Sequence, residues 1–433
     1  MKRREFLSLG ALGAAATTFP MGMGHAETKP VATKANIVIV GAGAAGTTMA
    51  NRLNQRLEGA RITIIDPRTT HLYQPGLSLV ATGLKPADYI TSDEERWLPE
   101  GVNWIREPVA AIDAESRIVA TESGAAISYD WLVLAPGLVL DYDAIDGFSR
   151  DLIGSNGVGA LYGGPDDAAR TWQAARKFTE EGGTGIFTRP ETEMKCAGAP
   201  LKHTFLIDDI GRRAGNAGRM NMIYAAPQAS LFGVPIVAEK VRMLFEDRGV
   251  ETMMQRRLVA IEPGAKRAVF AVDGGFEELD YDYIHVIPPQ RAPDFIRRSG
   301  LSWAERWQDQ GWVEVDPATL RHLRYPEIFA LGDVAGVPKG KTAASVKWQA
   351  PVVEDHLVSA IAGLEATQFY DGYTSCPLIT RVGRAMLVEF DYHNNLTPSF
   401  PGIIAPLEEL WTSWLMKEIA LKATYNAMLR GRA

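Results

Sequence analysis

Three glycines that directly follow a run of β-branched residues constrain the fold of this chain more than any other feature. Residues 35–40 read Ala-Asn-Ile-Val-Ile-Val, and Gly41, Gly43 and Gly46 follow in the pattern Gly-x-Gly-x-x-Gly. A continuous β-branched run is typical of a parallel strand that is buried on both faces. The first glycine permits a tight turn, the second lets a pyrophosphate approach the backbone, and the third allows close helix–strand packing. The pattern predicts a dinucleotide-binding fold.

An acidic residue further along the chain supports this prediction. A helix-compatible segment covers residues 47–57, and a second apolar strand covers residues 61–66 and ends in Asp66. At this distance from the glycines, a carboxylate can accept hydrogen bonds from both ribose hydroxyls of a dinucleotide. We therefore expect an α/β fold in which free amides at the start of the helix face the phosphates.

The first 26 residues predict an export signal. Lys2, Arg3 and Arg4 precede a stretch without charge at residues 6–24, and Ala26 closes a small-x-small cleavage site. Adjacent arginines followed by x-Phe-Leu are typical of a twin-arginine signal, with a general secretory signal or an uncleaved anchor as alternatives. We expect a periplasmic protein, and a peripheral contact with the inner membrane stays open.

Composition excludes several classes of function. The chain has 433 residues, which at about 150 residues per domain gives room for two or three domains. Its formal net charge of −7 gives no electrostatic reason to bind nucleic acid. Two cysteines cannot supply a four-cysteine zinc or iron–sulfur site, and no histidine spacing suggests a metal. We predict no metal site.

Two later segments resemble the flavoprotein superfamily that has two dinucleotide-binding domains. A strand that ends at Ala135 and Gly137 is similar to the strand of that superfamily that ends in an Ala-Thr-Gly turn. A strand that ends at Gly332 and Asp333 is similar to the one that brings a Gly-Asp pair to the flavin. The resemblance implies FAD as the cofactor, with Asp333 on the ribityl chain and the backbone at Gly332 near the pyrophosphate.

Members of that superfamily that use NAD(P)H carry a second nucleotide-binding unit in the middle of the chain. Here a helix is expected at residues 166–181, a strand at 182–187 and another strand at 220–225. The sequence after the first strand reads TRPETEMKCAGAP, without a second Gly-x-Gly-x-x-Gly pattern. We infer a pyridine-nucleotide domain that no longer binds nicotinamide, so that the reductant is another molecule.

The two cysteines of the chain lie in Gly/Pro-rich segments, which predict turns. Cys196 lies in the sequence KCAGAP, and Cys376 lies in DGYTSCPL. A buried free cysteine often acts as a small hydrophobic residue, whereas thiols of exported proteins tend to pair. The residues alone fit either a structural disulfide or a redox-active disulfide near the flavin.

Over residues 35–430 the chain is similar to the sulfide:quinone oxidoreductases, in the branch that includes the mitochondrial enzymes. The resemblance implies that sulfide attacks a Cys196–Cys376 disulfide, which leaves a persulfide on Cys376 and frees Cys196 as a thiolate beside the flavin. Sulfane sulfur then passes to a small acceptor, and electrons pass to a membrane quinone. Other branches of the family carry a third cysteine, which this chain lacks. Besides the cysteine motifs, the segments that carry the resemblance are HLYQPG at 71–76, KTAA at 341–344 and EFDY at 389–392.

Lysines near these motifs are candidates for charge stabilisation. Lys341 and Thr342 stand where a helix is expected to begin, and the resemblance implies that its amides and Lys341 stabilise negative charge on the reduced flavin. Lys195 and Lys202 are candidates for lowering the pKa of Cys196, because a nearby cation favours a thiolate. The alternative for both residues is a solvated surface charge.

The C-terminal region contains an expected amphipathic helix. Apolar residues recur every three to four positions between residues 406 and 430, while Lys417 and neighbouring charged residues lie on the opposite face. Such a helix either lies in a membrane interface on the quinone side or covers the core of the protein. The resulting division is an export signal at 1–26, an FAD domain at 35–150 and 301–365, an NAD-domain-like insert at 151–300, and a C-terminal region at 366–433.

Two other functions remain open from the sequence. One is the flavoprotein subunit of a flavocytochrome c-type sulfide dehydrogenase, which passes electrons to a haem partner. The other is a non-catalytic sulfur-handling flavoprotein. The sequence does not identify the sulfur acceptor, the type of quinone or the oligomeric state.

Overall fold

A five-stranded parallel sheet forms the first half of the molecule. The computed structural model describes residues 29–432, so the predicted export signal at 1–26 lies outside the described residues. The strand order is β22-β11-β2-β4-β7, and every neighbouring pair is parallel, as the β-branched runs predict. The strands are β2 (Asn36–Val40), β4 (Arg61–Ile65), β7 (Asn103–Ile105), β11 (Trp131–Leu134) and β22 (Ile328–Ala330).

Helix α2 (Ala44–Arg56) packs on this sheet directly after the glycine turn. Gly41 has a φ of +98°, and a Cβ added there would lie 2.3 Å from the carbonyl oxygen of Ala135. A Cβ on Gly46 would lie 1.8 Å from the carbonyl oxygen of Gly41. Both positions therefore need glycine for the helix and the strands to approach each other closely.

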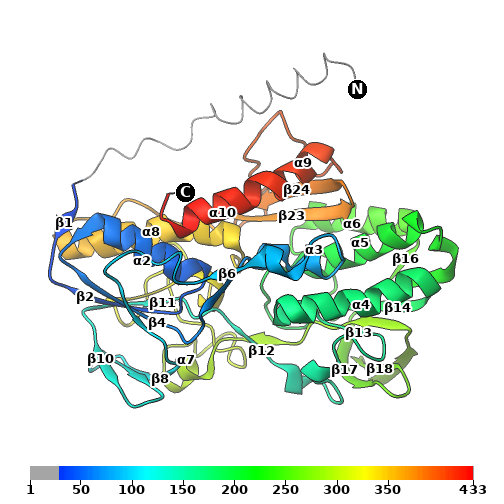
Figure 1. Ribbon diagram of the computed structural model, residues 1–433, viewed down its shortest axis with the longest axis horizontal. Helices are drawn as coiled ribbons and strands as arrows, with labels where there is room; N and C mark the ends of the chain where they lie inside the picture. The colour runs from blue at the N-terminus through cyan, green and yellow to red at the C-terminus, as the bar shows by residue number, and fades with distance from the viewer. Residues whose placement is uncertain (1–28, 433) are drawn as a thin grey trace.

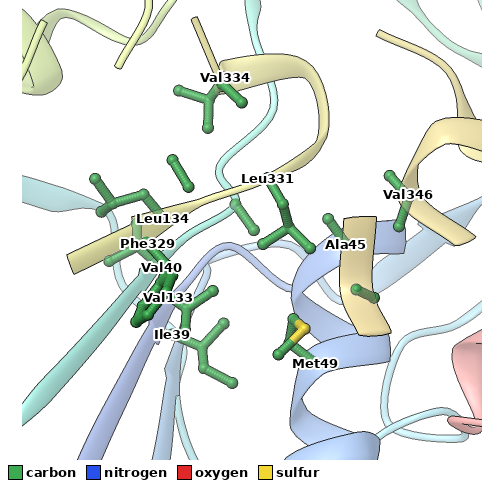
Figure 2. Close-up of a cluster of buried hydrophobic side chains, with 14 of the residues drawn as sticks. Ile39, Val40, Ala45, Met49, Val133, Leu134, Phe329, Leu331, Val334 and Val346 are labelled. Carbon is green, nitrogen blue, oxygen red and sulfur yellow. The ribbon is translucent and has the colours of Figure 1, made fainter. Parts of the chain in front are cut away.

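The core of this half joins residues that lie far apart in the sequence. Figure 2 shows Ala45 and Met49 of α2 beside strand residues such as Ile39 and Val133, with Val346 of helix α8 (Ala343–Ala362) on the other side. The strand β22 enters the same sheet although it follows β11 by almost two hundred residues. The first sheet is thus completed only by the later part of the chain.

A second five-stranded parallel sheet lies beside the first along the long axis of the molecule (Figure 1). The helix and strands predicted at 166–181, 182–187 and 220–225 are present within one residue at each end. The sheet has the order β13-β20-β14-β15-β16. Its elements are β13 (Val158–Gly159), α4 (Pro165–Glu181), β14 (Gly183–Thr188), α5 (Ala199–Arg213), β15 (Met220–Ala226), α6 (Pro235–Arg248), β16 (Val250–Met254) and β20 (Tyr283–His285).

The C-terminal region corrects two predictions. Cys376 lies inside strand β23 (Thr374–Arg381), which pairs with β24 (Arg384–Phe390), and not in a turn. The C-terminal helix begins at residue 411 and not near 406, and a π-helical turn divides it. It comprises α9 (Trp411–Leu415), the π-helical turn η8 (Met416–Ala420) and α10 (Leu421–Leu429), which cross the top of Figure 1.

Smaller elements connect the two sheets and cover their edges. Two antiparallel sheets, each of three strands, flank the larger ones. Among residues 29–432, no helix is long and apolar enough to cross a membrane. The smaller elements include α3 (Leu77–Val80), β8 (Val109–Asp113), β9 (Ile118–Thr121), β10 (Ala126–Ser128), β17 (Arg257–Glu262), β18 (Arg267–Val272), β19 (Gly275–Asp280) and α7 (Asp294–Arg298).

Candidate active site

The structure brings the two cysteines together. Both are free thiols, and Cys196 packs against the buried apolar cluster that contains Cys376. Cys376 reaches the site from β23, and Cys196 from the turn before α5. A Cβ added to Gly198 would lie 2.3 Å from the Cys376 sulfur, so only glycine leaves room for this approach. The pair is placed for reversible disulfide formation.

The backbone at Cys196 is held in an uncommon conformation. Its φ is +47°, in the left-handed region that few residues other than glycine adopt. The amide of Cys196 donates to the carbonyl oxygen of Lys341 at 2.9 Å, and its own carbonyl oxygen accepts from the Tyr162 hydroxyl at 3.1 Å. These bonds tie the cysteine turn to the segment that precedes α8. Sequence reasoning missed Tyr162, because nothing in its local sequence marks it.

Lys202 supplies the charge that the thiol pair needs. Its Nζ donates to the Cys196 sulfur at 3.3 Å, and its side chain is buried. The hydrogen bond from the Cys376 thiol, followed by the charge of Lys202, holds the pKa of Cys196 well below its ordinary value. The interaction with Cys196, followed by burial, raises the pKa of Cys376. The surroundings therefore favour the thiolate at Cys196 rather than at Cys376, and the surface alternative for Lys202 is wrong because its side chain is buried.

Lys195 takes a different place from Lys202. Its Nζ donates to the Gln74 side-chain oxygen at 2.7 Å, and no hydrogen bond joins it to the Cys196 sulfur in the described part of the chain. Burial lowers the pKa of Lys195 to about 8, although the charge of Asp333 opposes this shift. Lys195 therefore links the cysteine turn to the HLYQPG segment.

The glycine turn leaves space for a phosphate. The nearest atom to a Cβ on Gly43 would be the Nη2 of Arg68 at 3.6 Å, so the backbone is open on that side. Gly137 has a φ of +74°, and a Cβ there would meet nothing within 4 Å. Ala135 instead packs its carbonyl group against Gly41. An open backbone beside a guanidinium group fits a pyrophosphate.

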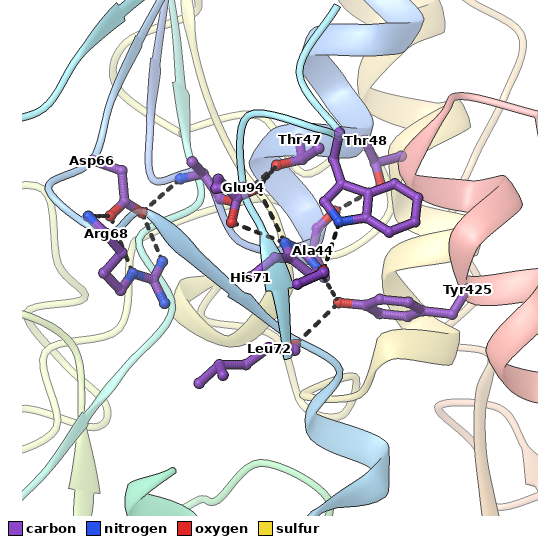
Figure 3. Close-up of polar contacts among 12 residues, drawn as sticks. Ala44, Thr47, Thr48, Asp66, Arg68, His71, Leu72, Glu94 and Tyr425 are labelled. Carbon is purple, nitrogen blue, oxygen red and sulfur yellow. Dashed lines mark hydrogen bonds and ion pairs between the residues drawn. The ribbon is translucent and has the colours of Figure 1, made fainter. Parts of the chain in front are cut away.

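Asp66 makes contacts that the sequence did not predict. One carboxylate oxygen accepts from the Ala42 amide at 2.7 Å and from the Arg68 Nη2 at 2.7 Å, and the other accepts from the Arg68 amide and Nε (Figure 3). These bonds lower the pKa of Asp66 against the opposing effect of burial. All four acceptor positions are taken, so the expected bond to a ribose requires Arg68 to release an oxygen.

Asp333 presents a carboxylate without a hydrogen-bond partner among the described residues. Burial raises its pKa, while the charges of Lys195 and Lys341 act in the opposite direction. The preceding Gly332 has a φ of +74°, and its amide donates to the Gln349 side-chain oxygen at 2.8 Å. An unpartnered acceptor in this turn fits the hydroxyl groups of a ribityl chain.

Lys341 and Thr342 shape the segment before α8. Thr342 is the N-cap of α8, and its hydroxyl accepts from the Ser345 amide at 3.0 Å. The Nζ of Lys341 donates to the carbonyl oxygens of Asp333 and Ala335 at 2.7 and 3.1 Å, and lies 3.6 Å from the ring centroid of Trp312. Lys341 thus holds the Gly332–Asp333 turn, and its expected action on the flavin stays a prediction.

Sequence reasoning missed a chain of hydrogen bonds that joins the HLYQPG segment to the C-terminal helix. One ring nitrogen of His71 lies 2.9 Å from a Glu94 carboxylate oxygen, and the other lies 2.7 Å from the Tyr425 hydroxyl (Figure 3). Glu94 also accepts from the Thr47 hydroxyl of α2 at 3.0 Å. His71 belongs to a motif visible in the sequence, but no local pattern marks its two partners.

The segment that leads to Cys196 follows β14 at the edge of the second sheet where a nucleotide would be expected to bind. Ligands of such sheets bind beyond the carboxyl ends of the strands. At this edge, the Gln290 side-chain oxygen accepts from the Lys195 amide at 2.9 Å, and the Gln228 side chain donates to the carbonyl oxygen of Pro190 at 2.9 Å. Side chains of the crevice therefore bind the protein's own backbone, which fits the loss of the second glycine pattern.

Several known proteins are similar to this chain. Residues 35–158 match the family model described as pyridine nucleotide-disulphide oxidoreductase. The chain is 34% identical to the mitochondrial sulfide:quinone oxidoreductase of Mus musculus, over 91% of this chain and 86% of that protein. It is 35% identical to the corresponding protein of Dictyostelium discoideum, over 92% and 86%. The crystal structure of the sulfide:quinone oxidoreductase from Aquifex aeolicus matches with a TM-score of 0.77, at 19% identity and 92% coverage of each chain, and so shares the fold.

Proposed function

The chain belongs to the sulfide:quinone oxidoreductase family, and from this premise we propose that it oxidises sulfide at Cys196 and Cys376 and delivers the electrons to a quinone. The observation that carries the proposal is the packing of Cys196 against the buried cluster that contains Cys376, with the Lys202 ammonium on the Cys196 sulfur. A structural disulfide has no need of a neighbouring cation that stabilises one thiolate.

The asymmetry of the pair sets the direction of sulfide attack. In the oxidised form, hydrosulfide attacks the Cys376 sulfur, and the bond between the two cysteine sulfurs breaks. The products are a Cys376 persulfide, which keeps the proton of hydrosulfide, and a Cys196 thiolate, which keeps the electron pair of the broken bond. A thiol of lower pKa leaves faster, and Lys202 stabilises Cys196 in that role.

FAD is the cofactor that this proposal requires. When bound, FAD would supply a two-electron acceptor for the re-formation of the Cys196–Cys376 disulfide, after the sulfane sulfur has left Cys376, and a donor to the quinone. The Gly41–Gly46 turn would hold its pyrophosphate, and the unpartnered carboxylate of Asp333 would accept from its ribityl hydroxyls. Lys341 keeps the turn that carries Asp333 in place. The FAD domain at 35–150 and 301–365 and the NAD-domain-like insert at 151–300 remain our proposed division of the chain.

The quinone side of the enzyme is proposed to lie at the C-terminal region, residues 366–433. Large apolar side chains there are exposed, namely Ile403 at 69%, Trp411 at 45% and Ile419 at 66%. Trp411 and Ile419 lie in helical elements and Ile403 in a turn, and such exposed apolar residues suit peripheral contact with a membrane, which supplies the quinone. The signal-like residues 1–26 support a periplasmic location at the inner membrane.

An anaerobic assay with two electron acceptors tests this function. Sulfide is added to the FAD-loaded enzyme, and flavin absorbance is followed before and after decylubiquinone is added. We expect bleaching by sulfide without NADH, followed by recovery with the quinone. Recovery with cytochrome c but not with the quinone would indicate a flavocytochrome-type dehydrogenase. An absence of bleaching would indicate a non-catalytic flavoprotein and would overturn the proposal.

A further inference from the structure

Every backbone amide and carbonyl group of Lys195 and Cys196 has a hydrogen-bond partner. The Tyr162 hydroxyl donates to both carbonyl oxygens, at 2.6 Å for Lys195 and 3.1 Å for Cys196. The Lys195 amide donates to the Gln290 side-chain oxygen at 2.9 Å. The Cys196 amide donates to the Lys341 carbonyl oxygen, also at 2.9 Å. Tyr162 and Gln290 are thus side chains that hold the backbone on either side of the Cys196 thiol.

Tyr162 lies at the edge of the second sheet where a nucleotide would be expected to bind. It belongs to the 3₁₀ turn η5 (Leu161–Gly163), which follows the carboxyl end of β13, and ligands of parallel sheets bind beyond such ends. Its side chain is 7% exposed, and the Lys195 Nζ lies 5.1 Å from its ring centroid. Burial raises the pKa of the Tyr162 hydroxyl well above its ordinary value, so the hydroxyl keeps its proton and remains a donor.

The turn that Tyr162 holds is one that a cysteine does not adopt readily. The φ of Cys196 is +47°, and the left-handed region costs free energy for any residue with a Cβ. In the disulfide form, the covalent bond to Cys376 would hold Cys196 in place. In the dithiol form that bond is absent, and the hydrogen bonds of the turn oppose its relaxation. The structure contains free thiols and retains the left-handed conformation.

We propose that Tyr162 is a positioning residue, which keeps the reduced Cys196 in its left-handed turn and within reach of Cys376 for re-formation of the disulfide. The inference rests on the proposed function and assigns a task to the edge of the second sheet, which lacks the glycine pattern. A disulfide forms only over a narrow range of separations between the two cysteines. Without the Tyr162 hydroxyl, the dithiol can relax whereas the disulfide cannot, so the equilibrium shifts toward the dithiol.

The test is a thiol–disulfide equilibrium with glutathione, which needs neither sulfide nor quinone. The FAD-loaded enzyme is equilibrated without oxygen in mixtures of reduced and oxidised glutathione. Oxidised glutathione takes two electrons and two protons from the cysteine pair, so that one protein disulfide and two glutathione thiols form. For Tyr162→Phe, we expect the equilibrium constant for disulfide formation to fall about fivefold, the size of one neutral hydrogen bond. Alkylation of the remaining thiols followed by mass spectrometry measures it.

The matched control is Tyr224→Phe. Tyr224 is a fully buried tyrosine of the same sheet, and its hydroxyl has no hydrogen-bond partner in the described part of the chain. Loss of this hydroxyl should leave the equilibrium unchanged. Replacement of Tyr162 by 4-aminophenylalanine restores a donor at the same place and should recover part of the loss. A second variant, Gln290→Met, removes the acceptor of the Lys195 amide and should shift the equilibrium in the same direction as Tyr162→Phe.

An unchanged equilibrium constant in Tyr162→Phe would overturn the inference, even if its Tm falls, because the tyrosine would then be only structural. An equal fall in Tyr224→Phe would overturn it as well. If Tyr162→Phe does not fold, Gln290→Met decides, and an unchanged constant in that variant counts against the inference. Failure of the proposed function is a different result, in which the wild type shows no sulfide-dependent quinone reduction while its equilibrium with glutathione is still measurable.

Discussion

The Nζ of Lys202 lies 3.3 Å from the Sγ of Cys196, inside the protein and one helical turn along α5 from the cysteine segment. Burial alone would lower the pKa of Lys202, but the neighbouring cysteine sulfurs raise it, so the ammonium stays charged. The lysine and the thiolate thus stabilise each other's charged form. Several measurable consequences depend on this pair and on the packing around it.

Removal of the Lys202 charge should raise the pKa of Cys196. In Lys202→Met we expect an increase of about one unit or more, because a nearby cation is lost from a buried thiolate. The native pKa of Cys196 is depressed, so in the wild type the thiolate is protonated only at low pH. As the pH falls, the variant should lose its thiolate at a higher pH than the wild type does. The measurement is the pH dependence of iodoacetamide alkylation at Cys196 in the reduced enzyme. Lys195→Met is the control, and an equal shift in both variants would contradict the role of Lys202.

The two cysteines should act as one unit. Cys196→Ser and Cys376→Ser should each reduce sulfide–quinone turnover by orders of magnitude while FAD stays bound. The double variant should be little worse than either single one, because residues that act together are not additive. Cys196→Ser should also lack the long-wavelength absorbance of a thiolate beside a flavin. Near-normal turnover with a lowered Tm would show instead that the pair is a structural disulfide.

A methyl group at Gly198 should disturb the thiol pair directly. Its Cβ would lie 2.3 Å from the Cys376 sulfur, a distance at which one of the two must move. We expect Gly198→Ala to slow flavin reduction by sulfide at least about tenfold, with FAD content unchanged. Gly218→Ala is the matched control, because a Cβ there meets nothing within 4 Å. Stopped-flow absorbance measures the rate of flavin reduction by sulfide in both variants. Equal rates in Gly198→Ala and Gly218→Ala would mean that the Cys376 sulfur moves aside freely.

A buried ion pair should hold α2 and α8 together. The Arg52 Nε lies 2.5 Å from a Glu354 carboxylate oxygen, and both side chains are less than a tenth exposed. Glu354→Gln leaves the guanidinium group buried without its charge partner, so we expect a loss of about 3 kcal/mol in the free energy of unfolding. Urea denaturation followed by flavin fluorescence measures it. Glu180→Gln removes an exposed pair with Arg176 and should change stability by less than about 0.5 kcal/mol.

The sequence predicted those parts of the fold that depend on local patterns. The glycine turn at residues 41–46 and the strands around it follow from side-chain size and β-branching within short segments. Cys376 was predicted in a turn because Asp371, Gly372 and Pro377 surround it. In the structure, pairing with residues 384–390 overrides these local preferences and places Cys376 in a strand. Strand pairing of this kind depends on tertiary contacts that composition does not reveal.

The charged residues of the site were the hardest to predict. Lysine is rarely buried, so the sequence placed Lys417 on the charged face of its helix and left Lys202 open between a partner of Cys196 and a surface charge. Lys202 is buried because a thiolate compensates its charge, and Lys417 because the π-helical turn places it inside the protein. Arg68 was missed although it follows Asp66 by two residues, since only the folded turn shows that they bind each other.

The hydrogen bond between His71 and Tyr425 has a consequence for biosynthesis. The two residues are 354 positions apart, and His71 also joins Glu94, which binds the start of α2 beside the glycine turn. A nascent chain can form the glycine turn early, but it lacks this closure until residue 425 has left the ribosome. The complete nucleotide cradle therefore forms only after almost the whole chain has been translated, and a product that stops short of Tyr425 leaves the ribosome with this cradle unclosed.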